Sequence, residues 1–249
     1  MSTRVSSVPP RSSKALSRPP CRYRFPSADS GVGEHGLIGV GADFEPGTML
    51  AAYHAGIFPW PVPEMDVVAW CSPDPRAIFP LDTTPHWSRS LRRSMRKKPF
   101  KVTVDRDFAG VLEGCGDRRG GTWITGELVR GYLQLHELGW AHSLEVWNTE
   151  SGALVGGIYG LSLGSCFTAE SMFHRETDAS KVAFASMIEL LRPSFTIFDA
   201  EVPNPHLDSL GCLPLARAAF LPQLSRALQD DLVFPSLGDG ISPGELIAD

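Results

Sequence analysis

One polar stretch, ESMFHRETDASK at residues 170–181, most constrains how this chain can fold. Residues 153–159 and 165–168, which precede it, have the composition of paired strands, whereas residues 179–191 carry apolar side chains at helical spacing. A junction from strand to helix concentrates unpaired backbone N–H groups and displays loop side chains. This one combines charged and hydroxyl groups with Met172 and Phe173, which predicts a polar site with an apolar wall. A solvated loop with one buried aromatic ring is the alternative.

The bulk composition limits the class of protein. A chain of 249 residues can form one large domain or two small ones. It has no run of 18 apolar residues, so we expect no membrane span. Its five cysteines and seven histidines show no spacing typical of a metal site. We therefore expect reduced thiols, a cytoplasmic location, no metal and no membrane contact.

Charge is distributed unevenly along the chain. The net charge is −5, but residues 89–101 carry +7 and residues 1–24 carry +6, which leaves −18 on the remainder. The basic segment falls on a predicted helix, residues 87–97, and a concentration of cations of this kind favours docking of phosphates. A helix that is merely soluble is the alternative. The candidate phosphate-binding residues are Arg89, Arg92, Arg93, Arg96, Lys97 and Lys98.

A tryptophan lies between two prolines, in Pro59-Trp60-Pro61. Proline on both sides holds the backbone extended, and a rigid aromatic side chain is suited to stacking on a nucleobase. A buried structural Trp60 packed between the proline rings is equally compatible with the pattern.

The segment TIFDAEV, residues 196–202, predicts a strand that carries Asp199 and Glu201 on the same face. Two carboxylates one pleat apart repel each other, so the pKa of one should rise. Such a pair can act as a general base near neutral pH. The alternative is the solvated face of an edge strand.

Shifts in composition suggest four segments. Residues 1–22 are rich in Ser, Pro and Arg and are expected to be a disordered basic tail. A small N-terminal domain is expected over residues 23–76, and a catalytic domain over residues 77–230. Residues 231–249, rich in Pro, Gly and acidic residues, are expected to form a loose tail.

Eight short motifs occur in order along the chain and together resemble the leucyl/phenylalanyl-tRNA–protein transferase family. They are GIFPW (56–60), WCSPDPR (70–76), GTWIT (121–125), HELG (136–139), AHS (141–143), ESMF (170–173), ASK (179–181) and SLG (209–211). The resemblance implies an α+β fold, with a small N-terminal domain and a domain like the Gcn5-related N-acetyltransferases. The larger domain would have a mixed, mainly antiparallel sheet flanked by helices.

The resemblance also implies an activity and its residues. The enzyme would move Leu or Phe from aminoacyl-tRNA to an N-terminal Arg or Lys of an acceptor protein, tagging it for N-end-rule degradation, as a monomer and without a cofactor. Asp199 matches the catalytic Asp, and Glu201 stands where the family usually has Gln. Substrate-binding positions are expected at Trp60, Trp123, Tyr132, Ile158, Glu170, Ser171, Met172 and Met187.

Two other functions are compatible with parts of this pattern. An acetyl-CoA-dependent N-acetyltransferase would share the expected fold, but the junction at residues 174–179 has no glycine for a pyrophosphate loop. A non-catalytic tRNA-binding protein would need the basic helix and Trp60 but not Asp199.

Overall fold

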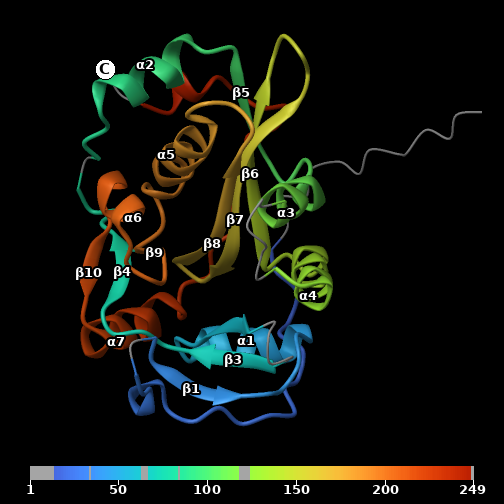
Figure 1. Ribbon diagram of the computed structural model, residues 1–249, viewed down its shortest axis with the longest axis vertical. Helices are drawn as coiled ribbons and strands as arrows, with labels where there is room; N and C mark the ends of the chain where they lie inside the picture. Colours follow the sequence, from blue (N-terminus) through green and yellow to red (C-terminus); the bar gives the residue numbers. More distant parts are fainter. Residues whose placement is uncertain (1–13, 34, 63–66, 84, 118–123, 248–249) are drawn as a thin grey trace, which may run out of the picture.

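The structure of the chain is a computed structural model, which describes residues 14–33, 35–62, 67–83, 85–117 and 124–247. A small three-stranded antiparallel sheet, in the order β1-β3-β2, packs with helix α1 at one end of the molecule (Figure 1). Its elements are β1 (Leu37–Val40), α1 (Pro46–His54), β2 (Phe58–Val62) and β3 (Val67–Cys71). Pro46 occupies the first turn of α1, where no backbone donor is needed, and Gly56, at φ 75°, turns the chain from α1 into β2.

A seven-stranded sheet in the order β10-β4-β9-β8-β7-β6-β5 forms the larger part of the molecule. Only β8 and β9 pair in parallel, and every other neighbouring pair is antiparallel. The α+β prediction with a mixed, mainly antiparallel sheet is confirmed. The strands are β4 (Arg76–Phe79), β5 (Phe100–Val104), β6 (Ala141–Asn148), β7 (Leu154–Leu163), β8 (Cys166–His174), β9 (Ile197–Asp199) and β10 (Leu213–Leu215).

Helices cover both faces of this sheet. Figure 1 shows α5 on one face and α3 and α4 on the other. Side-chain caps set several starts: Ser88 accepts from Leu91 N–H at α2, and Thr125 accepts from Leu128 N–H at α4. The helices are α2 (Arg89–Lys97), α3 (Phe108–Gly116), α4 (Gly126–Glu137), α5 (Ala179–Leu191), α6 (Pro205–Leu210) and α7 (Arg217–Ala227), with 3-10 turns at Ala28–Ser30 and Pro243–Glu245.

The large sheet separates two apolar cores. One is built around α5 and contains Phe184 and Phe198. The other joins α3 and α4 to the small sheet, and there Met49 and Trp70 are buried in the same cluster as Tyr159 of β7. The small N-terminal unit therefore shares a continuous core with one face of the large sheet, which fixes its position relative to that sheet.

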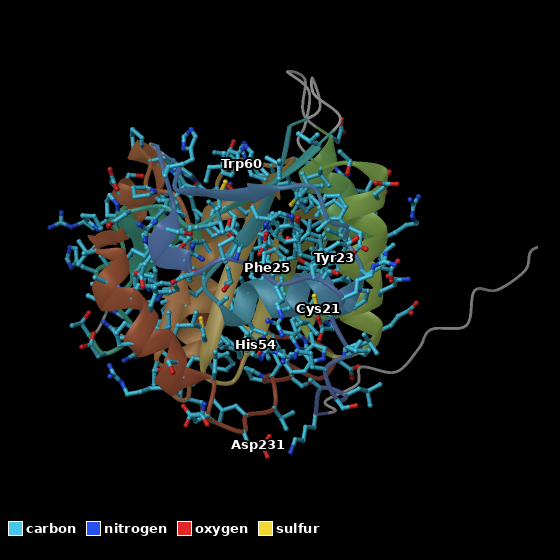
Figure 2. The ribbon with its side chains drawn as sticks, turned by 90° about the horizontal axis from the view of Figure 1, so that it is seen from below. Cys21, Tyr23, Phe25, His54, Trp60 and Asp231 are labelled. Atoms are coloured by element: carbon cyan, nitrogen blue, oxygen red, sulfur yellow. The ribbon has the colours of Figure 1, made fainter. Side chains whose placement is uncertain are left out.

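Both ends of the described chain contact the body; of the N-terminal tail expected to be disordered, residues 1–13 lie outside the described residues. In the N-terminal segment, Leu16 N–H donates to Leu138 O, and Lys14 pairs with Asp231. Figure 2 shows Cys21, Tyr23 and Phe25 along the same end of the molecule as His54 of α1. At the other end, the expectation of a loose C-terminal tail is wrong for residues 231–247, because their apolar side chains pack into the α5 core. The packed residues are Leu232, Phe234, Leu237, Ile241, Leu246 and Ile247.

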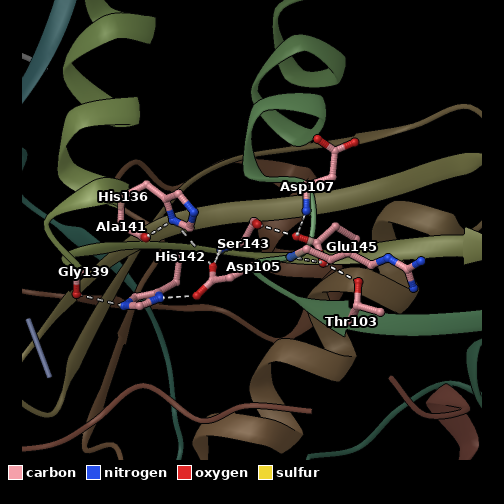
Figure 3. Close-up of polar contacts among 10 residues, drawn as sticks. Thr103, Asp105, Asp107, His136, Gly139, Ala141, His142, Ser143 and Glu145 are labelled. Carbon is pink, nitrogen blue, oxygen red and sulfur yellow. Dashed lines mark hydrogen bonds and ion pairs between the residues drawn. The ribbon is translucent and has the colours of Figure 1, made fainter. Parts of the chain in front are cut away.

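A buried polar cluster lies where β5, α3 and β6 meet (Figure 3). Glu145 of β6 is fully buried and accepts hydrogen bonds from the hydroxyls of Ser143 and Thr103. Burial raises its pKa to about 7, although these two donors act in the opposite direction. Beside it, Asp105 accepts from Ser143 N–H and contacts Nδ1 of His142 at 2.7 Å.

Replacing Glu145 with Gln should therefore flatten the dependence of stability on pH. The folded-state pKa of Glu145 lies above that of the unfolded chain, so its contribution is fully present below about pH 4.5 and is lost as pH rises towards 7. The fall in unfolding free energy between about pH 5 and pH 8 should be smaller by roughly 2–3 kcal/mol in Glu145→Gln. Urea unfolding at both pH values measures this difference, and an equal fall in both proteins would contradict the assignment.

Candidate active site

A pocket of about 600 Å³ opens between the small sheet and the large one. Its volume lies in the usual range for small-molecule sites. Four parts of the chain line it: β2, the neighbouring strands β7 and β8, the start of α5, and the segment after β9. The lining residues include Pro59, Trp60, Ile158, Ala169, Glu170, Ser171, Met172, Asp178, Lys181, Ala200, Glu201 and Val202. The polar stretch of the sequence therefore does form one side of a pocket.

The first part of that stretch, residues 170–174, is strand, residues 175–178 form a turn, and helix α5 begins at Ala179. β8 extends to His174 and pairs with β7, so that Met172 lies opposite Ile158 and both reach the pocket. The pairing passes from Tyr159↔Ser171 to Gly160↔Ala169, which leaves Glu170 as the extra residue of a β-bulge. A bulge redirects a side chain relative to the regular alternation of a strand. The bulge therefore takes the Glu170 side chain out of the regular alternation of β8.

Glu170 contacts two buried phenols behind the pocket wall. Its Oε1 lies 2.7 Å from the hydroxyl of Tyr53 on α1, and its Oε2 lies 2.5 Å from the hydroxyl of Tyr132 on α4. The two hydroxyl oxygens lie 2.7 Å from each other. Burial raises the pKa of Glu170 to about 7, although the hydrogen bonds from Tyr132 and Tyr53 act in the opposite direction. The charge of nearby Asp199 adds to the effect of burial.

Asp199 does not line the pocket and is held in a buried ion pair. Nε of Arg76 lies 2.9 and 3.0 Å from its two carboxylate oxygens, and Nη2 lies 2.7 Å from Oδ2. Nη1 of Arg76 also donates to Gly56 O, at 3.3 Å, and the guanidinium lies over the rings of Phe58 and Phe220. A bidentate pair of this kind is the strongest form of charge-assisted hydrogen bond. The negative charge of Asp199 is therefore already paired with the positive charge of Arg76.

The predicted arrangement of Asp199 and Glu201 on one strand face is wrong. Strand β9 ends at Asp199, and Glu201 has a left-handed backbone with φ 64°. Its N–H donates to Oδ1 of Asp199 at 2.9 Å, and its side chain turns to the pocket. The alternative reading as a solvated edge is also wrong, because Asp199 is fully buried and Glu201 is 7% exposed.

The expectation that one carboxyl of this pair has a raised pKa holds for Glu201. Burial is the largest cause, followed by the charge of Glu170, while Arg76 acts in the opposite direction. Among the described residues, Oε1 of Glu201 has no hydrogen-bond partner. A buried carboxyl oxygen that lacks a partner disfavours the charged form, in the same direction as this pKa shift.

The other predicted site residues differ in their positions. Trp60, which is 37% exposed, lines the pocket and stacks in parallel on His35 with the ring centroids 5.8 Å apart. Ser171 also lines it, whereas Tyr132 reaches it only through Glu170. Met187 is fully buried in the α5 core and is not among the lining residues. Trp123 lies outside the described residues.

Sequence reasoning missed Arg76 and Tyr53. Arg76 closes the motif WCSPDPR, and a buried arginine needs a carboxylate partner, but the sequence does not show which carboxylate that is. Tyr53 lies on the apolar face of α1, where its spacing is typical of an ordinary core residue.

The basic helix α2 borders the pocket. Arg89, Arg93, Arg96 and Lys97 are exposed. On the inner side of the helix, the hydroxyl of Ser94 donates to Asp178 at 2.7 Å, and the following Lys98 bonds to Thr177 O. Asp178 and Thr177 both line the pocket, so Ser94 and Lys98 join this basic segment to the edge of the pocket.

Neither a metal centre nor a membrane span is seen in the part of the chain that the structure describes. Its His, Cys, Asp and Glu side chains nowhere gather in groups of three that could hold a metal ion. Among those same residues, no helix has both the length and the apolar character needed to cross a membrane.

Comparison with known proteins assigns the chain to a family. Residues 78–225 match the family described as leucyl/phenylalanyl-tRNA protein transferase, and residues 42–74 match the N-terminal domain of the same protein. A relative from Shewanella oneidensis with the name leucyl/phenylalanyl-tRNA–protein transferase is 46% identical over 217 residues, covering 85% of this chain and 90% of the relative. One of the same name from Stutzerimonas stutzeri is 46% identical and covers 82% and 91%.

Similar solved structures include FemX, with a TM-score of 0.45, 13% identity, and coverage of 58% of this chain and 60% of FemX. A GCN5-related N-acetyltransferase from Sphaerobacter thermophilus has a TM-score of 0.36, 17% identity, and coverage of 57% and 50%. The family assignment rests on the sequence matches. The chain belongs to the leucyl/phenylalanyl-tRNA–protein transferase family of aminoacyltransferases.

Proposed function

We propose that this protein moves Leu or Phe from aminoacyl-tRNA to the N-terminal Arg or Lys of acceptor proteins, and so tags them in the cytoplasm for N-end-rule degradation. The single observation that carries this is a pocket with an apolar wall and two carboxyl groups, joined at its edge to the cationic helix α2. An apolar amino acid, a cationic N-terminus and a phosphate backbone each need one of these features.

Three parts of the aminoacyl-tRNA donor meet different parts of the site: the amino-acid side chain, the terminal adenine and the phosphates. Ile158 and Met172 form an apolar surface for the Leu or Phe side chain, which discriminates by about 1–3 kcal/mol per methylene. Trp60 supplies an aromatic face for the terminal adenine, and base stacking of this kind contributes about 1–3 kcal/mol. The exposed arginines of α2 meet the phosphates of the tRNA.

The chemistry requires no nucleophile from the protein, because the aminoacyl ester is already activated. The acceptor amine attacks the ester carbonyl to form the new C–N bond, the C–O bond to the tRNA ribose breaks, and the proton lost by the amine ends on the departing ribose oxygen. The protein has to orient the amine and stabilise the developing charge. Because Asp199 is held by Arg76, it acts as a positioning residue that fixes the backbone of Glu201. The neutral acid of Glu201 donates a hydrogen bond into the pocket, a donor that the amide of a Gln at this position would also offer.

The experiment that tests this function is transfer of labelled Leu or Phe from charged tRNA to a peptide with N-terminal Arg. The same peptide with N-terminal Ala and the donor acetyl-CoA serve as controls. Transfer to the Arg peptide from charged tRNA alone is the expected result. Acetylation from acetyl-CoA without aminoacyl transfer would identify a different enzyme, and tRNA binding without transfer would identify a binding protein.

Glu201→Gln should keep transfer within about tenfold of the unaltered enzyme, because Gln offers the same donor as a neutral acid. Asp199→Ala should abolish transfer, because it removes the acceptor for the Glu201 N–H and leaves Arg76 buried without its partner. The latter loss costs about 3–5 kcal/mol, so circular dichroism must accompany the assay. A Glu201→Gln protein that folds but does not transfer would rule out the proposed role of Glu201.

Replacing the exposed Arg89, Arg93 and Arg96 with Gln should weaken tRNA binding and reduce its dependence on salt. For three phosphate contacts, the slope of log K against log salt should fall by about 2 to 3. The matched control is Arg130→Gln, since Arg130 is an exposed arginine on α4. Filter binding over a salt series gives the slope. An unchanged slope in the triple variant would place the phosphates elsewhere.

A further inference from the structure

The contacts among Glu170, Tyr53 and Tyr132 form a closed triangle of three side chains. Oε1 of Glu170 lies 2.7 Å from the Tyr53 hydroxyl, the Tyr53 hydroxyl lies 2.7 Å from that of Tyr132, and the Tyr132 hydroxyl lies 2.5 Å from Oε2. All three distances are those of O–H···O hydrogen bonds. Each contact therefore needs one proton between its two oxygens.

The number of protons depends on Glu170. If its carboxyl is ionised, the two phenols supply two protons for three contacts, and both donate to the carboxylate. The phenol oxygens of Tyr53 and Tyr132 would then face each other at 2.7 Å with no proton between them. If the carboxyl is neutral, each group donates to the next around the ring, and all three contacts are satisfied.

The phenols cannot release the proton instead. Burial raises the pKa of both Tyr53 and Tyr132 well above the ordinary value of 10, and the charge of Glu170 adds to the effect. The burial that raises the pKa of Glu170 to about 7 agrees with the proton count. The other ionisable groups that act on Glu170 are Asp199 and Glu201, which disfavour its negative charge, and Arg76, which favours it.

The three members of the ring belong to three different parts of the fold. Tyr53 lies in the last turn of α1, Tyr132 lies on α4, and Glu170 is the bulged residue of β8. The chain passes from Tyr53 through the turn at Gly56 directly into β2, which carries Trp60. Closing the ring therefore fixes α1, and with it the wall of the pocket that contains Trp60.

We propose that Glu170 is a positioning residue that works as a neutral acid, and that its shared proton locks the small N-terminal unit against β8 and α4. This role rests on the proposed function, in which Trp60 binds the donor. When Glu170 ionises, the ring opens, the Trp60 wall loosens, and the KM for aminoacyl-tRNA rises while kcat changes less.

Infrared difference spectroscopy tests the proton directly, without an activity assay. At about pH 6 the folded protein should show a carboxylic C=O band that is absent in Glu170→Gln. The band should shift in Tyr53→Phe, which opens the ring. It should not shift in Tyr159→Phe, the matched control, because Tyr159 is a buried phenol packed on the ring of Tyr132 outside the triangle. A spectrum in which neither Glu170→Gln nor Tyr53→Phe changes a carboxylic band would overturn the proposal.

Kinetics test the consequence for the donor. The KM for Leu-tRNA should rise between about pH 6 and pH 8 by about fivefold, the factor for one lost neutral hydrogen bond. Glu170→Gln closes the same ring with an amide that does not titrate, so its KM should not vary over this range. If the KM of Glu170→Gln still rises with pH, the proposal that the proton on Glu170 holds the small N-terminal unit in place is contradicted. Failure of all transfer would refute the proposed function but would leave the infrared result unaffected.

Discussion

The buried ion pair between Arg76 and Asp199 organises this structure. Arg76 begins β4, the first strand of the large sheet, and Asp199 ends β9 beside it. The same guanidinium donates to Gly56 O in the turn from α1 to β2, and packs on Phe58 of the small sheet and on Phe220 of α7. A single cation thus connects the small sheet, the large sheet and the last helix. Because both charges are removed from water, neither can be lost without leaving the other unpaired.

The function of the site depends on three neighbouring carboxyl groups, those of Asp199, Glu201 and Glu170, which differ in their partners. Asp199 is paired with Arg76 and accepts the backbone N–H of Glu201. It therefore holds the left-handed turn that directs Glu201 to the pocket. Glu201 is buried and Glu170 is partly buried, neither has a cation of its own, and removal from water is the largest cause of the raised pKa of each. The charge of Asp199 adds to both shifts as a smaller contribution. The pocket can then accept an apolar side chain on one wall and offer hydrogen bonds on the other.

Much of the fold could be predicted from the sequence because the patterns that specify a helix or a strand lie within short segments of the chain. The apolar spacing of residues 179–191 predicts helix α5 correctly. The site was predicted less well, since its geometry depends on distant contacts and on the backbone. Arg76 and Asp199 are separated by 123 positions, and nothing near either residue identifies its partner. The bulge at Glu170 and the left-handed backbone at Glu201 both break the alternation on which strand prediction rests. The C-terminal segment was missed because its apolar residues follow no period.

A double-mutant cycle between Arg76→Met and Asp199→Leu tests the central role of the ion pair most directly. Each single variant should unfold more easily, because each leaves one charge buried and unpaired. The double variant should regain stability, since apolar residues of similar size can replace a buried pair. It should nevertheless remain inactive in aminoacyl transfer, because the Glu201 turn has lost the oxygen that accepts its N–H. A double variant that folds and transfers Leu at the normal rate would contradict the account.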